Sequence, residues 1–181
     1  MKKTLLSLIA VIYLPFSIWG ATQTNSSPNI GAESAFDWIR SLAGEWEGSF
    51  EWSGGRSSKG PMSAKYYLTG GSNGTAVVED LIVAGKPIMT SVYHLDGAAL
   101  RMTHYCGGNQ PRLRASAIDE RKKTIHFDLV DVTNLKSPSA AHVQRVEMRL
   151  LDENHLTVTF TSREAGVDSY ELVQLTRLKR N

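Results

Sequence analysis

The sequence predicts an all-β protein, an antiparallel up-and-down barrel of about ten strands with a short N-terminal helix. Segments in which apolar and polar residues alternate recur from residue 45 almost to the C-terminus. The breaks between these segments are short and rich in Gly, Asp, Asn, Pro or Lys. No helical pattern follows residue 42, so the alternation of strands and helices that produces a parallel sheet is missing.

The helix is expected over 34–42, where Phe36, Ile39 and Leu42 share one face and Gly44 provides a stop. From residue 45 to 52 every even position is apolar or Gly and every odd position is acidic or Ser, which is typical of a strand with one buried face. Further strands are expected at 62–69, 75–83, 88–95, 98–106, 112–118, 124–131, 142–151, 155–162 and 168–178. A two-sheet sandwich is the alternative, and closure into a barrel is favoured because it leaves no exposed sheet edge.

Length and charge narrow the function classes. The chain has 181 residues, enough for one domain with a core of its own. It carries 20 basic and 18 acidic residues, and without residues 1–20, which hold Lys2 and Lys3 and no acid, the two numbers are equal. A neutral protein of this kind has no overall attraction for nucleic acid, so we expect no nucleic-acid partner.

The N-terminus predicts export. Residues 1–20 combine a basic start with a short apolar stretch and small residues at the end, as in a secretory signal peptide cleaved after Gly20 or Ala21. A membrane anchor is the alternative, but the apolar stretch is short and interrupted by Pro15, so we expect no stable membrane insertion. Residues 21–33 are polar and predict a flexible spacer, and 34–181 form the barrel domain. The expected location is secreted or periplasmic.

An Asp-Gly pair at 96–97 predicts a hairpin between two alternating segments. A two-residue turn pairs Leu95 with Ala98 and Tyr93 with Leu100. The more apolar of the two faces of this hairpin is then expected to point inward, and it carries Met89, Ser91, Tyr93, Leu95, Leu100, Met102, His104 and Cys106.

Two motifs resemble the lipocalin and calycin superfamily. Gly44-Glu45-Trp46 stands at the start of the first strand, and Arg177 stands in the last. In that superfamily a Trp at the barrel base packs beneath an Arg of the final strand, which implies structural roles for Trp46 and Arg177. A guanidinium over an indole is worth about 0.5–2 kcal/mol when sheltered.

A second resemblance covers most of residues 36–178. The stretches at 93–97, 103–111, 128–134 and 152–156 look like a family of secreted bacterial lipocalin-like proteins of unknown function. Nitrobindin-type haem barrels are distantly similar. They bind haem iron through a histidine near the C-terminus, whereas residues 156–181 contain no histidine, so this mode of haem binding is not expected here.

The inward face of the hairpin supplies the candidate site. A buried imidazole needs a partner, so His104 is expected either to bond a neighbouring strand or Tyr93, or to contact a ligand. Cys106 is the only cysteine, which excludes an internal disulfide, and it is expected to be a small buried hydrophobe rather than a nucleophile. His142 is expected at the cavity rim, in an inward set with Gln144, Val146, Met148 and Leu150.

Other polar residues remain open to two interpretations. Asn109 and Gln110 either cap a turn or line the cavity mouth, and Asp131 and Asn134 share this ambiguity. Either Glu79 or Asp80 is expected to point toward the interior. The favoured interpretation is that this carboxylate lies in water at the barrel rim. If it is buried instead, it should pair with an arginine, and the candidates are Arg112, Arg114 and Arg145. Basic residues in the presumed turns, Arg56 among them, are expected at the solvated surface.

These expectations favour an exported protein that holds a small hydrophobic or amphipathic molecule in its barrel, over an enzyme. The expected ligand-binding residues are Met89, Tyr93, Met102, His104, Cys106, Asn109, Gln110 and His142. The alternatives are haem or iron binding through His104 with Met89 or Met102, and catalysis with His104 as general acid or base. No metal-ligand spacing is present, and the sequence names neither a cofactor nor an oligomeric state.

Overall fold

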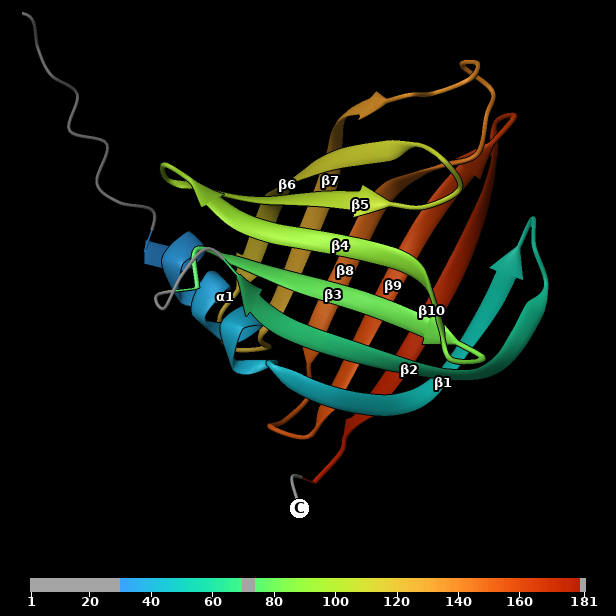
Figure 1. Cartoon of the computed structure of the whole chain (residues 1–181). Helices are drawn as coiled ribbons and strands as arrows, with labels where there is room; N and C mark the ends of the chain where they lie inside the picture. The colour runs from blue at the N-terminus through green and yellow to red at the C-terminus, as the bar shows by residue number, and fades with distance from the viewer. Residues whose placement is uncertain (1–29, 70–73, 180–181) are drawn as a thin grey trace, which may run out of the picture.

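Ten antiparallel strands follow one helix and close into a barrel in the computed structural model, which describes residues 30–69 and 74–179 (Figure 1). Each strand pairs with its neighbours in the chain, and the first pairs with the last, so the predicted up-and-down barrel is confirmed. The elements are α1 Ile30–Ser41, β1 Gly44–Gly54, β2 Ser58–Thr69, β3 Ala76–Val83, β4 Lys86–Asp96, β5 Ala99–Tyr105, β6 Gln110–Asp119, β7 Thr124–Thr133, β8 His142–Leu150, β9 His155–Glu164 and β10 Val167–Arg177.

The seam of the barrel joins β1 to β10, with Trp46 opposite Arg177 at one end and Gly54 opposite Ser169 at the other. The two strands come closest at Gly48. A Cβ atom at that position would lie only 1.8 Å from the backbone oxygen of Gln174, so the seam admits no side chain there.

Helix α1 begins earlier than the sequence predicts. It starts at Ile30 rather than residue 34, so its first residues fall within the segment 21–33 that was expected to be a spacer. The reason is that Ala32 and Ala35 are both buried and add another turn to the apolar stripe of Phe36 and Ile39. The helix lies across one end of the barrel (Figure 1). We call this end the base, and the opposite end the mouth.

The β4–β5 hairpin has the predicted faces with a different register. Leu95 pairs with Leu100 and Tyr93 with Met102, so the predicted pairs of Leu95 with Ala98 and Tyr93 with Leu100 are wrong. The turn lies one position later, and Gly97 there adopts a φ of 57°, which favours glycine. Because the slip changes each partner by two residues, the side chains keep their faces, and Ser91, Tyr93, Leu100, Met102 and His104 are buried as predicted.

The barrel interior is filled mainly by apolar side chains from all ten strands, and Trp46, Tyr66, Tyr93, Phe127 and Phe160 are the largest of those with no more than 1% exposure. Among the residues described, no helix has the length and apolar character needed to cross a membrane. The predicted signal peptide, residues 1–20, lies outside the described residues.

Candidate functional site

The base of the barrel is closed by Trp46 and Arg177. The guanidinium of Arg177 lies 4.2 Å from the centre of the Trp46 ring, which is the stacking that the resemblance implied. The indole N–H of Trp46 donates to the carbonyl oxygen of Leu42 at 2.9 Å. Arg177 donates to three carbonyl oxygens, those of Ser41, Ala43 and Glu153, at 2.8–3.0 Å. The base therefore joins the end of α1 to both strands of the seam.

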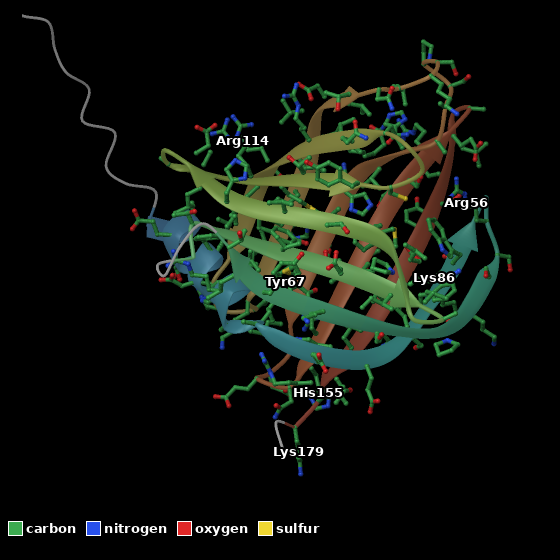
Figure 2. The ribbon with its side chains drawn as sticks, viewed as in Figure 1. Arg56, Tyr67, Lys86, Arg114, His155 and Lys179 are labelled. Atoms are coloured by element: carbon green, nitrogen blue, oxygen red, sulfur yellow. The ribbon has the colours of Figure 1, made fainter. Side chains whose placement is uncertain are left out.

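At the mouth, the barrel contains a cavity of about 170 Å³ that opens to solvent. Phe160 and Met89 form its apolar floor, with Val143 and Pro111 at its sides. Trp52 of β1 and His142 of β8 also line it. The β1–β2 turn, the β5–β6 turn and the β7–β8 loop surround it and contribute Arg56, Cys106, Gly107, Gly108, Asn109, Asn134, Lys136, Ala140 and Ala141. Figure 2 shows Arg56 at the end of the barrel away from α1. We call this the mouth cavity.

Glu171 is the acidic group of the mouth cavity. It points inward from β10, and the residue is only 2% exposed. Trp52 lies directly opposite Glu171 on β1, and Oε2 of the carboxyl group has no hydrogen-bond partner among the described residues. Burial raises the pKa of Glu171 to about 7, against the smaller lowering effects of Trp52 and Arg56. A buried carboxyl oxygen without a partner is costly, which makes it a candidate ligand contact.

Arg56 lies at the rim, where the sequence predicted only solvated surface. Its guanidinium stacks 5.0 Å from the centre of the Trp52 ring and forms an ion pair of 3.1 Å with Glu164. The arginine thereby holds the β1–β2 turn to the β9–β10 end of the wall. Its charge is paired with Glu164 at the surface, and no ion pair joins it to Glu171 among the described residues.

Deeper in the barrel, Glu79 is fully buried and bonded by two tyrosines. The hydroxyl of Tyr93 donates to Oε2 at 2.9 Å, and the hydroxyl of Tyr66 makes a very short hydrogen bond to Oε1. Burial raises the pKa of Glu79, and these hydrogen bonds oppose that rise. The sequence placed one carboxylate of this strand near the interior and favoured water or an arginine as its surroundings. Both interpretations are wrong, because phenol hydroxyls satisfy the carboxyl group instead.

The arginines proposed for that role all have other places. Arg112 pairs with Asp131 and Arg145 pairs with Asp128, both on the outer surface. Arg114 is exposed on β6, as Figure 2 shows. Asp80, beside Glu79 on β3, faces the other side of the sheet and accepts a hydrogen bond of 2.6 Å from Thr90.

His104 is buried between Ser91 and Phe160. Its Nδ1 lies 3.0 Å from the Ser91 hydroxyl, its ring lies 5.0 Å from that of Phe160, and its Nε2 has no partner in the described part of the chain. Burial lowers the pKa of His104 to about 4, so the imidazole is neutral at pH 7. His104 does not line the mouth cavity, whereas Phe160, against which its ring packs, does. The predicted partner Tyr93 bonds Glu79 instead.

Half of the predicted ligand-binding residues line the mouth cavity. Met89, Cys106, Asn109 and His142 do so, whereas Tyr93, Met102, His104 and Gln110 do not. The first three of the latter lie in close-packed core, and Gln110 is held on β6 by a hydrogen bond of 2.9 Å from Thr133. Asn109 lines the cavity, and its side chain donates at 2.8 Å to the carbonyl oxygen of Ala141 in the β7–β8 loop rather than to its own turn.

A β-bulge changes the inward set predicted for β8. The register shifts between Val143 and Arg145, so Val143 is buried and Gln144 is the extra residue. His142 still reaches the cavity rim, where its Nδ1 lies 2.7 Å from the carbonyl oxygen of Ala140 and its Nε2 contacts the Gln144 amide. Val146 and Met148 are buried as predicted.

Cys106 lies half-buried on the wall of the mouth cavity. Burial, and secondarily the negative field of Glu171, raise the pKa of its thiol, so the thiol is protonated at neutral pH. Among residues 30–69 and 74–179, no three His, Cys, Asp or Glu side chains come together in a group that could hold a metal ion.

The residues that the sequence missed at this site are Glu171, Trp52, Phe160 and Arg56. Glu171 carried a signal, because Ser169, Glu171, Val173 and Leu175 share one face of β10 and the last two are clearly apolar. An acid in the inward register of an otherwise apolar strand face marks a buried carboxyl group.

Comparison with solved structures agrees with the fold. Neither a protein-family model nor a curated protein matches this sequence. The chain is similar to Rv2717c from M. tuberculosis, with a TM-score of 0.54 and 15% identity over 80% of this chain and 98% of the other. It is also similar to the S-type phycobiliprotein lyase CPES from Guillardia theta, with a TM-score of 0.55 and 8% identity over 86% and 99% of the two chains. The shared feature is the fold, a closed barrel of the lipocalin-like type.

Proposed function

We propose that this protein binds a small amphipathic molecule in the mouth cavity. The observation that carries the proposal is the combination of an apolar floor, Phe160 and Met89, with one buried and unpartnered carboxyl oxygen on Glu171. Binding sites of this type bury the apolar part of a ligand and use a few polar groups to orient it.

The size of the cavity limits the ligand. Its volume of about 170 Å³ is below the roughly 300–1,000 Å³ typical of pockets for drug-sized molecules. The ligand is therefore small, or it places only one end in the cavity and leaves the rest in solvent between the surrounding turns.

The geometry favours binding in the mouth over the two alternatives that use His104. A haem or iron ligand needs space at Nε2, and a general acid or base needs a substrate within hydrogen-bond reach. The imidazole is 0% exposed, lies against Phe160 and does not line the mouth cavity. We therefore assign His104 to the core.

We also propose that the protein is exported by its N-terminal segment and works outside the cytoplasm. The basic and apolar pattern of residues 1–20 supports this, as does the lack of any cysteine besides Cys106 that a thiol-oxidising compartment could cross-link to it. N-terminal sequencing of the protein from its native host tests export: a mature N-terminus at residue 21 or 22 supports it, and a retained Met1 contradicts it.

Filling the mouth cavity tests the binding function. Benzyl alcohol serves as a probe with an apolar ring and one polar group, and its binding is followed by NMR titration of the full chain. Ala141→Trp places an indole at the cavity wall, and we expect it to weaken binding by about tenfold or more, which corresponds to about 1.4 kcal/mol.

The matched control is Ala117→Trp, since Ala117 is exposed on the outer face of β6. It should bind benzyl alcohol as the unaltered protein does. Equal binding by Ala141→Trp and Ala117→Trp would place the probe elsewhere and refute the proposal. Native mass spectrometry of the protein from its host then identifies what the cavity carries.

A further inference from the structure

The barrel interior is acidic without a compensating cation. Glu79 and Glu171 are both buried, and no lysine or arginine is buried among the described residues. Two tyrosine hydroxyls donate hydrogen bonds to Glu79, so each of its carboxyl oxygens has a partner. Glu171 is the one that faces a cavity, and its Oε2 has no partner among the same residues.

The nearby cationic side chains do not form ion pairs with Glu171. Arg56 lies at the rim, where it is ion-paired with Glu164 at 3.1 Å and stacked on Trp52. Lys136 also lines the cavity but is exposed on the β7–β8 loop. No ion pair reaches Glu171 in the described part of the chain, although buried charges in proteins are generally paired.

We propose that the ligand of the mouth cavity is a small organic ammonium ion whose N–H donates to the unpartnered Oε2 of Glu171, with its apolar body on Phe160 and Met89. This inference rests on the proposed binding function and names the chemical class of the ligand. It requires no bond to be made or broken.

The interior charges distinguish an ammonium ion from other amphipathic molecules. A hydroxyl group could donate to Oε2 but would leave the buried charge uncompensated. A carboxylate would face the like charges of Glu171 and, behind it, Glu79. An ammonium group supplies both the donor and the opposite charge, and charge-assisted hydrogen bonds are about twice as strong as neutral ones.

Three probes that share one ring test the inference: benzylamine, benzyl alcohol and benzoate. With the full chain at pH 7.5, we expect benzylamine to bind about tenfold or more tighter than benzyl alcohol, and benzoate to bind more weakly than either. Glu171→Gln keeps the size of the side chain and one acceptor oxygen. It should weaken benzylamine by about tenfold and weaken benzyl alcohol less, because the amide oxygen still accepts a hydrogen bond from a hydroxyl group.

Glu51→Gln is the matched control, because Glu51 is exposed on the outer face of β1 and its removal changes the net charge equally. It should leave the binding of all three probes unchanged. If it weakened benzylamine as much as Glu171→Gln does, the attraction would come from overall charge rather than from the cavity, and the inference would be wrong.

The pH profile adds a reading that a purely structural glutamate would not produce. The groups around Glu171 are Arg56, Cys106, Glu79 and the rim residues His142 and Lys136. Benzylamine stays protonated between pH 5.5 and pH 8, whereas Glu171 ionises near pH 7. Benzylamine binding should therefore strengthen across this range in the unaltered protein and stay flat in Glu171→Gln.

The outcomes separate this inference from the proposed function. If benzyl alcohol or benzoate binds as tightly as benzylamine and Ala141→Trp still blocks binding, the cavity is a binding site and the ammonium inference is wrong. If no probe binds, or if Ala141→Trp has no effect, the binding function itself fails. The ranking of the three probes on the unaltered protein decides the question even if Glu171→Gln does not fold.

Discussion

The two ends of the barrel differ in how far their polar side chains are hydrogen-bonded. At the base, Arg177 stacks on Trp46 and donates to three backbone carbonyl oxygens, and the Trp46 indole donates to a fourth. At the mouth, Glu171 is only 2% exposed, yet Oε2 lacks a partner among the described residues and the pKa of the carboxyl group is raised to about 7.

This difference agrees with the proposed function, in which the base stabilises the fold and the mouth binds a ligand. Buried polar groups in stable proteins are nearly always paired, and each exception needs a reason. Fully hydrogen-bonded polar groups at the base and an unpartnered carboxyl oxygen at the mouth are expected when one end stabilises the barrel and the other end binds a ligand.

The largest expected effect is at the base. Trp46→Ala removes a side chain with 0% exposure and leaves Arg177 without its ring, so it should lower the free energy of unfolding by about 3–5 kcal/mol. Urea denaturation followed by circular dichroism measures the change. Tyr170→Ala, which truncates an exposed aromatic residue of β10, is the control and should cost much less. A small effect of Trp46→Ala would mean that the base is not the stabilising end.

The next largest effect is a dependence of stability on pH that arises from the buried, neutral imidazole of His104. The pKa of His104 is lowered from 6.5 to about 4 by burial, so the unfolded chain binds a proton more readily than the folded chain between these values. Stability is then fully present above pH 6.5 and falls as the pH drops toward 4, by up to about 2–3 kcal/mol. Comparing urea midpoints of the unaltered protein and His104→Leu from pH 7 to pH 4 tests this, and the variant should lose less. Parallel curves would show that His104 does not titrate as expected.

The smallest expected effect concerns Glu171 at the mouth, where stability falls as the pH rises rather than as it drops. Burial raises the pKa of Glu171 from 4.5 to about 7, so the folded protein binds the proton more tightly and stability falls as the pH rises from 4.5 through 7. Glu171→Gln removes this loss and should stabilise the protein without ligand by about 1–2 kcal/mol at pH 8. Thermal unfolding at pH 5 and pH 8 measures it, with Glu51→Gln as control. A destabilised Glu171→Gln at pH 8 would assign the carboxylate to the structure instead of to a ligand.

Alternation of apolar and polar residues was enough to predict the strands and the inward face of the β4–β5 hairpin, but not the start of β8, where a bulge changes the inward set. All ten strands and the helix are where the sequence places them to within a few residues, because a period of two depends only on which side of a sheet is buried. The same argument explains why the hairpin faces are correct although its register is not. The register depends on the turn, and Gly97 with its positive φ occupies a different turn position from the one expected.

The candidate site was less predictable, because a cavity depends on how far side chains fill the barrel. Four of the eight predicted residues line the mouth cavity, and the other four were lost mainly because the interior around His104 is close-packed. Glu79 shows a second limit. An arginine was expected beside a buried acid, and the two tyrosines that bond it come from neighbouring strands whose separations along the chain no local pattern reveals.

The pairing of β1 with β10 has a consequence for how the chain reaches its final form. Arg177 and Ala43, which bond at the base, are 134 residues apart, so the ring of strands closes only after every strand from β1 to β10 is available. Until then the growing sheet carries two unpaired borders, each able to recruit a foreign strand. Gly48 lies on one of these borders, and a substitution there would obstruct the last step of assembly while leaving the earlier hairpins intact.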